Sequence, residues 1–242
     1  MEDLRAALMT GIDIPIPECR LILHQPSIKE ISYLGETTYF TGAQTLCLNK
    51  TMFIKDEVDL ATINNFQIFM MVMVEKETND KKKATLDTLR VLFPDYKVLL
   101  TPQSLLFQKE GQEPIMVDIS NFEQFQEYLR AVFCVKSGPM DQQAFNPANA
   151  EAKRIADKLM RGRERIAAEK GTSMASIIVQ YLSILPVAVH VPKSELESYS
   201  LFAFYDLIER FALWINWDLD VRTRLAGGKP DSHPENWMKS LH

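Results

Sequence analysis

Apolar residues recur at intervals of three and four along three long stretches of the chain, which is the spacing of one face of an α-helix. The stretches run from Ile63 to Lys76, from Lys81 to Phe93 and from Leu201 to about Leu225. Pro94 follows the second stretch and Gly227-Gly228 follows the third, and both residue types end helices. The pattern therefore predicts three helices, each with one side that faces a core.

Short runs of β-prone residues lie between turn-forming residues in the first half of the chain. The runs predicted to form strands are 19–24, 96–100, 105–108 and 115–119. The last three predict a small antiparallel sheet, with a turn at Lys109 to Gln112. The segment Ile14-Pro15-Ile16-Pro17 cannot be helical, because each proline fixes its own φ and restricts the residue before it. We expect it to form an extended arm.

Two segments have the capping-box spacing, in which a serine and a glutamate three residues later satisfy free amides at a helix start. Ser27 to Glu30 predicts a helix that begins near Ile28, and Ser120 to Glu123 predicts another. The apolar face of the latter consists of Phe122, Phe125, Leu129, Val132 and Phe133. The stretch 37–48 has mixed preferences and is interpreted as helix.

The chain changes character between Lys136 and Asn149, where glycine, prolines and side-chain amides gather. Such a composition is typical of a linker. Beyond it we expect helices at 150–170, from 173 to about 189, and at 201–225. The predicted fold is α+β and predominantly helical, with a mixed domain at 1–140 and a helical domain at 141–242 that ends in a polar tail.

The composition is that of an ordinary soluble globular protein, with 46% hydrophobic and 24% charged residues among 242. Its net charge of -5 disfavours a nucleic-acid partner, because phosphate binding needs a basic excess. The first nine residues lack the pattern of a secretory signal. The longest apolar runs are shorter than the roughly 20 residues of a membrane span. We therefore expect a protein that is not exported by that route and has no membrane segment.

No motif for catalysis or cofactor binding emerges from the chain. The four histidines do not pair at zinc-ligand spacing, and the three cysteines lie far apart. Gly227-Gly228-Lys229 is followed by Pro230, where a phosphate loop needs a hydroxyl residue. We predict no enzymatic activity and no catalytic, cofactor-binding or metal-binding residue. An enzyme of another type would need Asp206, Asp218 and Asp220 to meet a histidine in one cleft.

Two charged segments in the second half each have two interpretations. The last helix carries Asp206, Glu209, Arg210, Asp218, Asp220, Arg222 and Arg224. Pairing along a solvated helix face is favoured there over a metal site, whose ligands must converge. The basic stretch 153–170 either docks on an acidic protein surface or is a solvated face with internal ion pairs. Its candidate partner-binding residues are Lys158, Arg161, Arg163 and Arg165.

Apolar side chains interrupt the polar tail at Trp237 and Met238. An indole without periodic apolar neighbours either folds back on the helical domain or anchors a partner. We therefore regard both residues as candidate partner-binding residues. The eleven methionines, three of them at positions 70, 71 and 73, either fill the core or form an adaptable binding groove.

Four segments become informative when they are taken together. They are Ile14-Pro15-Ile16-Pro17, Pro26 to Gly35, Leu225 to Gly228 and Asn236 to Lys239. In this combination, and in the layout of an amino-terminal domain followed by a helical extension, the chain resembles the tail assembly chaperones of tailed bacteriophages. The resemblance implies a non-enzymatic assembly factor in the cytoplasm of the infected bacterium. It also implies two partners, the tape-measure protein, whose hydrophobic helices such chaperones coat, and the tail-tube protein, which they recruit.

The same resemblance carries further expectations. Members of this family leave before the virion is finished, and some exist in a short and a frameshift-extended form. They have no catalytic residues to transfer to this chain. The alternative is a structural virion protein, such as a tail, baseplate or connector component, which would share the absence of catalytic motifs. The sequence leaves self-association open.

Overall fold

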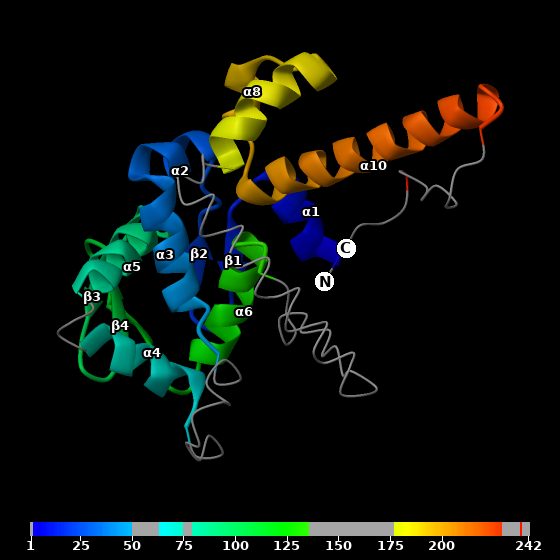
Figure 1. Ribbon diagram of the computed structural model, residues 1–242. Coiled ribbons are helices and arrows are strands. Elements are labelled where there is room, and N and C mark those ends of the chain that lie inside the picture. Colours follow the sequence, from blue (N-terminus) through cyan, green and yellow to red (C-terminus); the bar gives the residue numbers. More distant parts are fainter. Residues whose placement is uncertain (1, 50–62, 75–78, 136–176, 229–237, 239–242) are drawn as a thin grey trace, which may run out of the picture.

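The computed structural model describes residues 2–49, 63–74, 79–135, 177–228 and 238. Its elements are, in chain order, α1 (Glu2–Thr10), β1 (Ile14–Ile16), β2 (Leu21–Leu23), α2 (Ile28–Leu34), α3 (Glu36–Leu46), α4 (Asn65–Val74), α5 (Asn79–Leu92), β3 (Lys97–Leu100), β4 (Leu105–Gln108), β5 (Ile115–Val117), α6 (Phe122–Val132), α8 (Ile177–Val189), α9 (Lys193–Leu196) and α10 (Leu201–Leu225). The predicted α+β, mostly helical fold class is confirmed. Figure 1 shows α10 extending away from the body that the other elements form.

The first sheet is a ribbon of β1 and β2, which pair antiparallel with Ile14 opposite Leu23. Alternate side chains of both strands are buried, because the pleat sends successive side chains to opposite faces. The predicted extended arm is thus a strand. The strand predicted at 19–24 is shorter than expected, because Arg20 has a φ of 55° and belongs to the turn before β2.

The second sheet has the order β3-β4-β5 with both pairs antiparallel, as the sequence predicts. Its inner face is aromatic at Phe107, whose ring centroid lies 4.9 Å from that of Phe93 and 5.9 Å from that of Phe125. These rings belong to β4, to the residue after α5 and to α6. The sheet is therefore held by edge-on aromatic contacts with the helices that precede and follow it.

Helices α3 and α5 pack closely because Gly42 of α3 has no side chain. A Cβ at this position would come within 2.9 Å of the Ala84 carbonyl oxygen and would collide with the Thr88 side chain, both on α5. Protein interiors tolerate no such overlap. Gly42 is thus a packing requirement of the body.

The carboxy-terminal helices join the core of the amino-terminal elements. Buried Leu182 and Leu185 of α8, Leu196 of α9, and Leu201 and Phe204 of α10 belong to the same apolar cluster as the cores of α2 to α6. Backbone hydrogen bonds at 2.9 Å, from Ile28 N to Tyr199 O and from Lys29 N to Glu197 O, join the two regions as well. The linker predicted at 136–149 lies outside the described residues, so the boundary between domains stays a prediction.

The two predicted capping boxes have different outcomes. Ser27 caps α2 as expected, since its hydroxyl accepts from Glu30 N and the Glu30 carboxylate accepts from Ser27 N. The helix predicted at Ser120 to Glu123 forms as α6, but its capping box does not, because α6 begins after Asn121 and the Ser120 hydroxyl donates to Asp118 Oδ1 at 2.6 Å. Asp118 thus competes successfully for the hydroxyl that the spacing assigned to the helix.

The other predicted helices appear within one or two residues of their expected ends wherever the structure describes them. The apolar face of α6 is buried throughout. The two glycines after α10 end the helix, with Gly227 at a φ of 81° and Gly228 N donating to Thr223 O. The helix predicted at 150–170 lies outside the described residues. No prediction covered α1.

Candidate functional site

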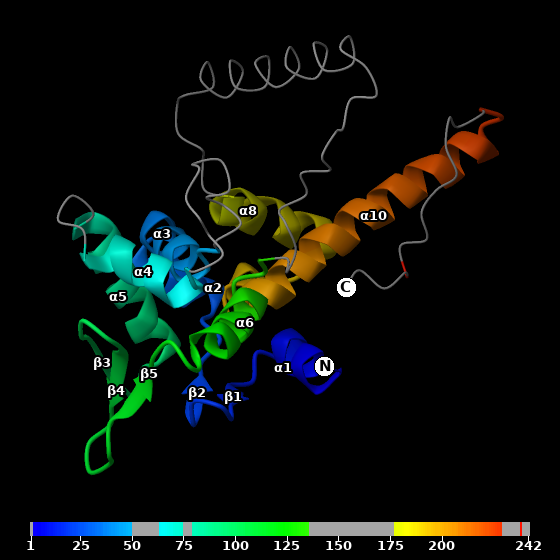
Figure 2. The ribbon, with the colours of Figure 1, turned by 90° about the horizontal axis from the view of Figure 1, so that it is seen from below.

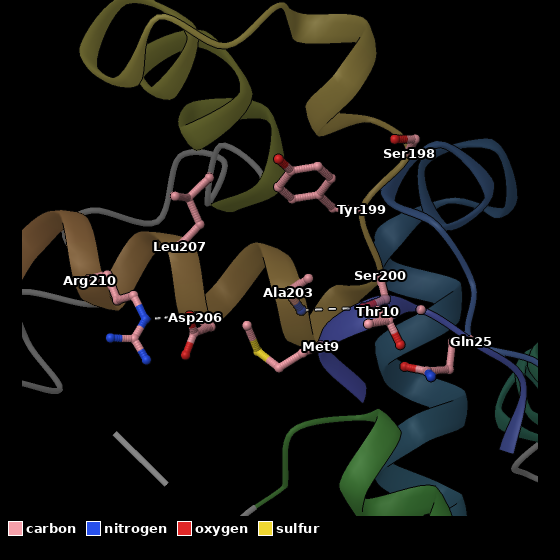
Figure 3. Close-up of a pocket in the computed structure, with 11 residues that line it drawn as sticks. Met9, Thr10, Gln25, Ser198, Tyr199, Ser200, Ala203, Asp206, Leu207 and Arg210 are labelled. Atoms are coloured by element: carbon pink, nitrogen blue, oxygen red, sulfur yellow. Dashed lines mark hydrogen bonds and ion pairs between the residues drawn. The ribbon is translucent and has the colours of Figure 1, made fainter. Parts of the chain in front are cut away.

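A pocket of about 560 Å³ lies between the end of α1, the segment 198–200 and the first turns of α10. Its wall consists of Met9, Thr10, Gly11, Gln25, Ser198, Tyr199, Ser200, Ala203, Asp206, Leu207 and Arg210. Figure 3 shows α10 along one side of the pocket, with Gln25 and Arg210 toward opposite ends. The pocket thus brings together residues from the two ends of the described chain, such as Met9 and Arg210.

Gln25 is a buried polar residue of this wall, with 4% of its surface exposed. Its Nε2 donates to Ala7 O at 2.7 Å and to Ile12 O at 2.5 Å. Both acceptors are carbonyl oxygens at the end of α1, so the side chain holds the turn between α1 and β1 in place. Because Nε2 donates to these two carbonyl oxygens, Oε1 is the atom of the amide group that faces the pocket.

The ion pair between Asp206 and Arg210 forms the other end of the pocket, with Arg210 Nε 2.7 Å from Asp206 Oδ2. The sequence predicts this pairing, as it predicts Asp218 with Arg222 and Asp220 with Arg224, both at 2.8 Å. The predicted solvated face is wrong at Asp206. The Asp206 side chain is only 4% exposed, because it lies on the part of α10 that packs against α1.

A second, more apolar pocket of about 420 Å³ lies between α6, α1 and α10. Phe202, Tyr205 and Cys134 contribute to its wall, together with Arg130 and Glu209. Burial, with a smaller contribution from Glu209, raises the pKa of the Cys134 thiol to about 12. A thiol in that state is protonated at neutral pH and is not a nucleophile.

The buried thiols elsewhere have the same character. Burial raises the pKa of Cys19 to about 11 and that of Cys47 to about 12. At neutral pH these thiols are therefore protonated. Within the described part of the chain, no three of the histidine, cysteine, aspartate and glutamate side chains come together as a metal site would require.

Apolar side chains are exposed on two helices of the carboxy-terminal region. On α8, Val179 is 60% and Val187 is 77% exposed. On the outer half of α10, by which we mean residues 212–225, Trp214 is 43%, Leu219 is 57% and Leu225 is 83% exposed. The Trp214 ring stacks on Phe211 of the same helix, with centroids 6.4 Å apart. The apolar stripe found in the sequence ends at Ile215 and does not include these three exposed side chains of α10.

Most of the partner-binding residues predicted from the sequence lie outside the described residues. They are Lys158, Arg161, Arg163, Arg165 and Trp237. Met238 is described and is 66% exposed. The Gln25 pocket escaped the sequence analysis, because nothing in the pattern around a single glutamine indicates that distant residues enclose it.

Comparisons with protein-family models, with curated proteins and with solved structures found no match. Within the described residues, every helix is too short or too polar to pass through a bilayer.

Proposed function

We propose that this chain is a tail assembly chaperone of a tailed bacteriophage, which binds the tape-measure protein and the tail-tube protein without catalysing a reaction. Its place of action would be the cytoplasm of the infected bacterium. The resemblance of the segments at 14–17, 26–35, 225–228 and 236–239 suggests the family. The exposed apolar surface of α8 and the outer half of α10 supports a binding role.

The outer half of α10 has the properties that a holder of apolar helices requires. Exposed aromatic and aliphatic side chains such as Trp214 and Leu225 offer apolar contact area to a partner. The ion pairs Asp218–Arg222 and Asp220–Arg224 support the helix and keep its surface charged. The helix can therefore keep its own structure while Trp214 and Leu219, which lie on different sides of it, are available for contact with a partner.

Co-expression tests this proposal directly. The full chain is produced with the tape-measure protein of the same phage genome, and the soluble complex is recovered through a tag on the chain. We expect a soluble complex for the unaltered chain and a loss of at least tenfold in recovery for Trp214→Asp combined with Leu219→Asp. Asn216→Asp adds a charge at an exposed polar position of the same helix and is the matched control, which should retain the complex.

Three results would contradict the proposal. One is a tape-measure protein that stays insoluble in the presence of the chain, and another is a complex that the variant with Trp214→Asp and Leu219→Asp retains. The third is the chain's presence in stoichiometric amount in purified virions, measured by mass spectrometry, which would establish the alternative, a structural virion protein.

A further inference from the structure

The amide group of Gln25 has only one orientation that its surroundings allow. Its Nε2 donates to two backbone carbonyl oxygens, Ala7 O at 2.7 Å and Ile12 O at 2.5 Å. Exchanging nitrogen and oxygen would place Oε1 against both carbonyls, which cannot donate. Oε1 therefore faces the pocket, where Figure 3 shows it on the side of Thr10.

Gln25 Oε1 is a buried acceptor that no donor among the described residues reaches. A buried polar atom in this state costs folding free energy, and native proteins rarely leave one unsatisfied. The nearby hydroxyl groups do not supply the proton, because each donates to another oxygen. Thr10 donates to Ala6 O at 2.8 Å, Ser198 to Glu195 O at 2.6 Å and Ser200 to Leu8 O at 3.0 Å. At this end of the pocket, a ligand with a hydrogen-bond donor would therefore satisfy Gln25 Oε1.

The charges of the pocket favour an uncharged ligand. Among the described residues that line it, only Asp206 and Arg210 are charged, and they form an ion pair with each other. A buried ammonium or carboxylate would lack a counter-charge of its own and would lose its hydration. The ligand therefore donates through a neutral group.

The dimensions of the pocket select among neutral donors. Ala203 and Arg210 are seven residues apart on α10, which corresponds to roughly 10 Å along a helix. Met9, Ala203 and Leu207 supply apolar wall between the two ends. Beyond the Nε–H group that donates to Asp206, the Arg210 guanidinium carries further N–H groups that can donate to a carbonyl. A ligand matches the pocket if it has an N–H donor at the Gln25 end, an apolar body in the middle and a carbonyl group at the Arg210 end.

We propose that this pocket binds an uncharged carboxamide ligand, whose N–H donates to Gln25 Oε1 and whose apolar part packs against Met9 and Leu207. Met9 is 39% exposed and has a flexible, unbranched side chain, so it can adjust its conformation to a ligand. The carboxamide comes from a free small molecule or from a peptide bond of another protein. This site is independent of the exposed surface of α8 and α10.

An NMR titration of the full chain tests the proposal with three probes. Benzamide represents a free carboxamide, N-acetylphenylalanine methylamide represents a peptide, and methyl benzoate keeps the shape of benzamide but has no N–H donor. We expect shifts of the backbone amide signals of Gly11, Ser200 and Ala203 with both amides. We expect methyl benzoate to bind at least tenfold more weakly than benzamide, because it leaves the buried acceptor unsatisfied. Tighter binding of benzamide would identify a free carboxamide as the ligand, and tighter binding of N-acetylphenylalanine methylamide would identify a peptide bond of another protein.

A pair of variants on α10 supplies the control. Ala203→Leu fills the pocket without removing any of its polar groups, and it should abolish the shifts at Gly11 and Ser200. Ala212→Leu makes the same change at an exposed position of the same helix and should bind benzamide as the unaltered chain does. Thermal unfolding followed by circular dichroism verifies that both variants are folded.

The proposal is overturned by equal binding of benzamide and methyl benzoate. It is also overturned if neither amide shifts these signals at tens of millimolar, which would mean that solvent alone satisfies Gln25. Shifts that persist in folded Ala203→Leu would place the binding elsewhere and exclude this pocket.

Discussion

The two halves of α10 have similar residue types but opposite surroundings. In the inner half, residues 201–211, Leu201 is 1% and Phe204 is 0% exposed. In the outer half, Trp214 is 43% and Leu225 is 83% exposed. Figures 1 and 2 agree that the outer half leaves the body of the molecule. An apolar stripe thus indicates a helix that can be buried, and the presence of a partner surface decides whether it is.

The difference separates stability from function along one helix. The inner half belongs to the core that α2 to α6 build, so changes there should affect folding. The outer half contributes little to that core, so changes there should affect binding to another molecule. Substitutions in the two halves can test this division between stability and binding.

Truncation of Phe204 tests the division most strongly. Phe204→Ala should lower the free energy of unfolding by about 3–5 kcal/mol, because it leaves a cavity in a packed core. Trp214→Ala removes a larger side chain but should cost less than about 1 kcal/mol, because the ring is partly in solvent. Urea denaturation of both variants, followed by circular dichroism, measures the two values. Similar losses for the two variants would refute the division.

Added volume should be tolerated in the outer half and not in the body. Gly42→Ala should destabilise the protein by about 1–3 kcal/mol, because the new methyl group collides with α5. This loss exceeds the gain of about 1 kcal/mol that alanine brings to a helix interior. Ala212→Leu, by contrast, should change stability by less than about 0.5 kcal/mol. Differential scanning calorimetry can compare them, and a Gly42→Ala variant as stable as the parent would show that α3 and α5 can move apart.

The two serines with capping-box spacing should differ in their contribution to stability. Ser27→Ala should cost about 1 kcal/mol, because it removes the cap of α2, which contacts the segment before α10. Ser120→Ala removes a hydroxyl that bonds only to Asp118 and not to the helix, and we expect a smaller loss. Urea unfolding midpoints measured side by side give the comparison. Equal losses would mean that the cap geometry at Ser27 adds nothing.

Acidic pH should lower the free energy of unfolding, because it protonates Glu30. Burial acts to raise the pKa of this carboxyl, but hydrogen bonds from the Ser27 hydroxyl and amide and the proximity of His24 outweigh it, so the pKa is lowered from 4.5. A carboxyl with a lowered folded-state pKa contributes stability above its unfolded pKa, and this contribution is lost as the pH falls through the folded value. Glu30→Gln should therefore flatten the loss of stability below about pH 4.5.

The control for this pH dependence lies on the outer half of α10. Asp218 pairs with Arg222, whose side chain is 73% exposed. Exposed pairs of this kind contribute less than about 1 kcal/mol. Asp218→Asn should accordingly leave the acid limb of the stability curve nearly unchanged. Thermal unfolding between pH 3 and pH 7 measures both variants, and a steeper change for Asp218→Asn than for Glu30→Gln would contradict the assignment.

Local patterns predicted much of the fold because their causes are local. The bounds of α10, the start of α2 at Ile28 and the three-strand sheet follow from helical periodicity, a capping serine and turn residues, all of which act over a few positions. The error at Ser120 has a local cause too. Asp118, two residues earlier, accepts the hydroxyl hydrogen bond that the spacing reserved for the helix. Spacing alone does not rank such competing acceptors.

The sequence by itself determined most of the helix ends and the three-strand sheet, since backbone hydrogen bonding and side-chain spacing operate within a few residues. Only the tertiary structure decided that Asp206 is buried while Asp218 is not, and that Gln25 meets Ser200 across one pocket. It also decided that Phe204 enters the core while Trp214 remains exposed. These outcomes depend on which distant surfaces come together, and burial is a property of that contact and not of the residue type.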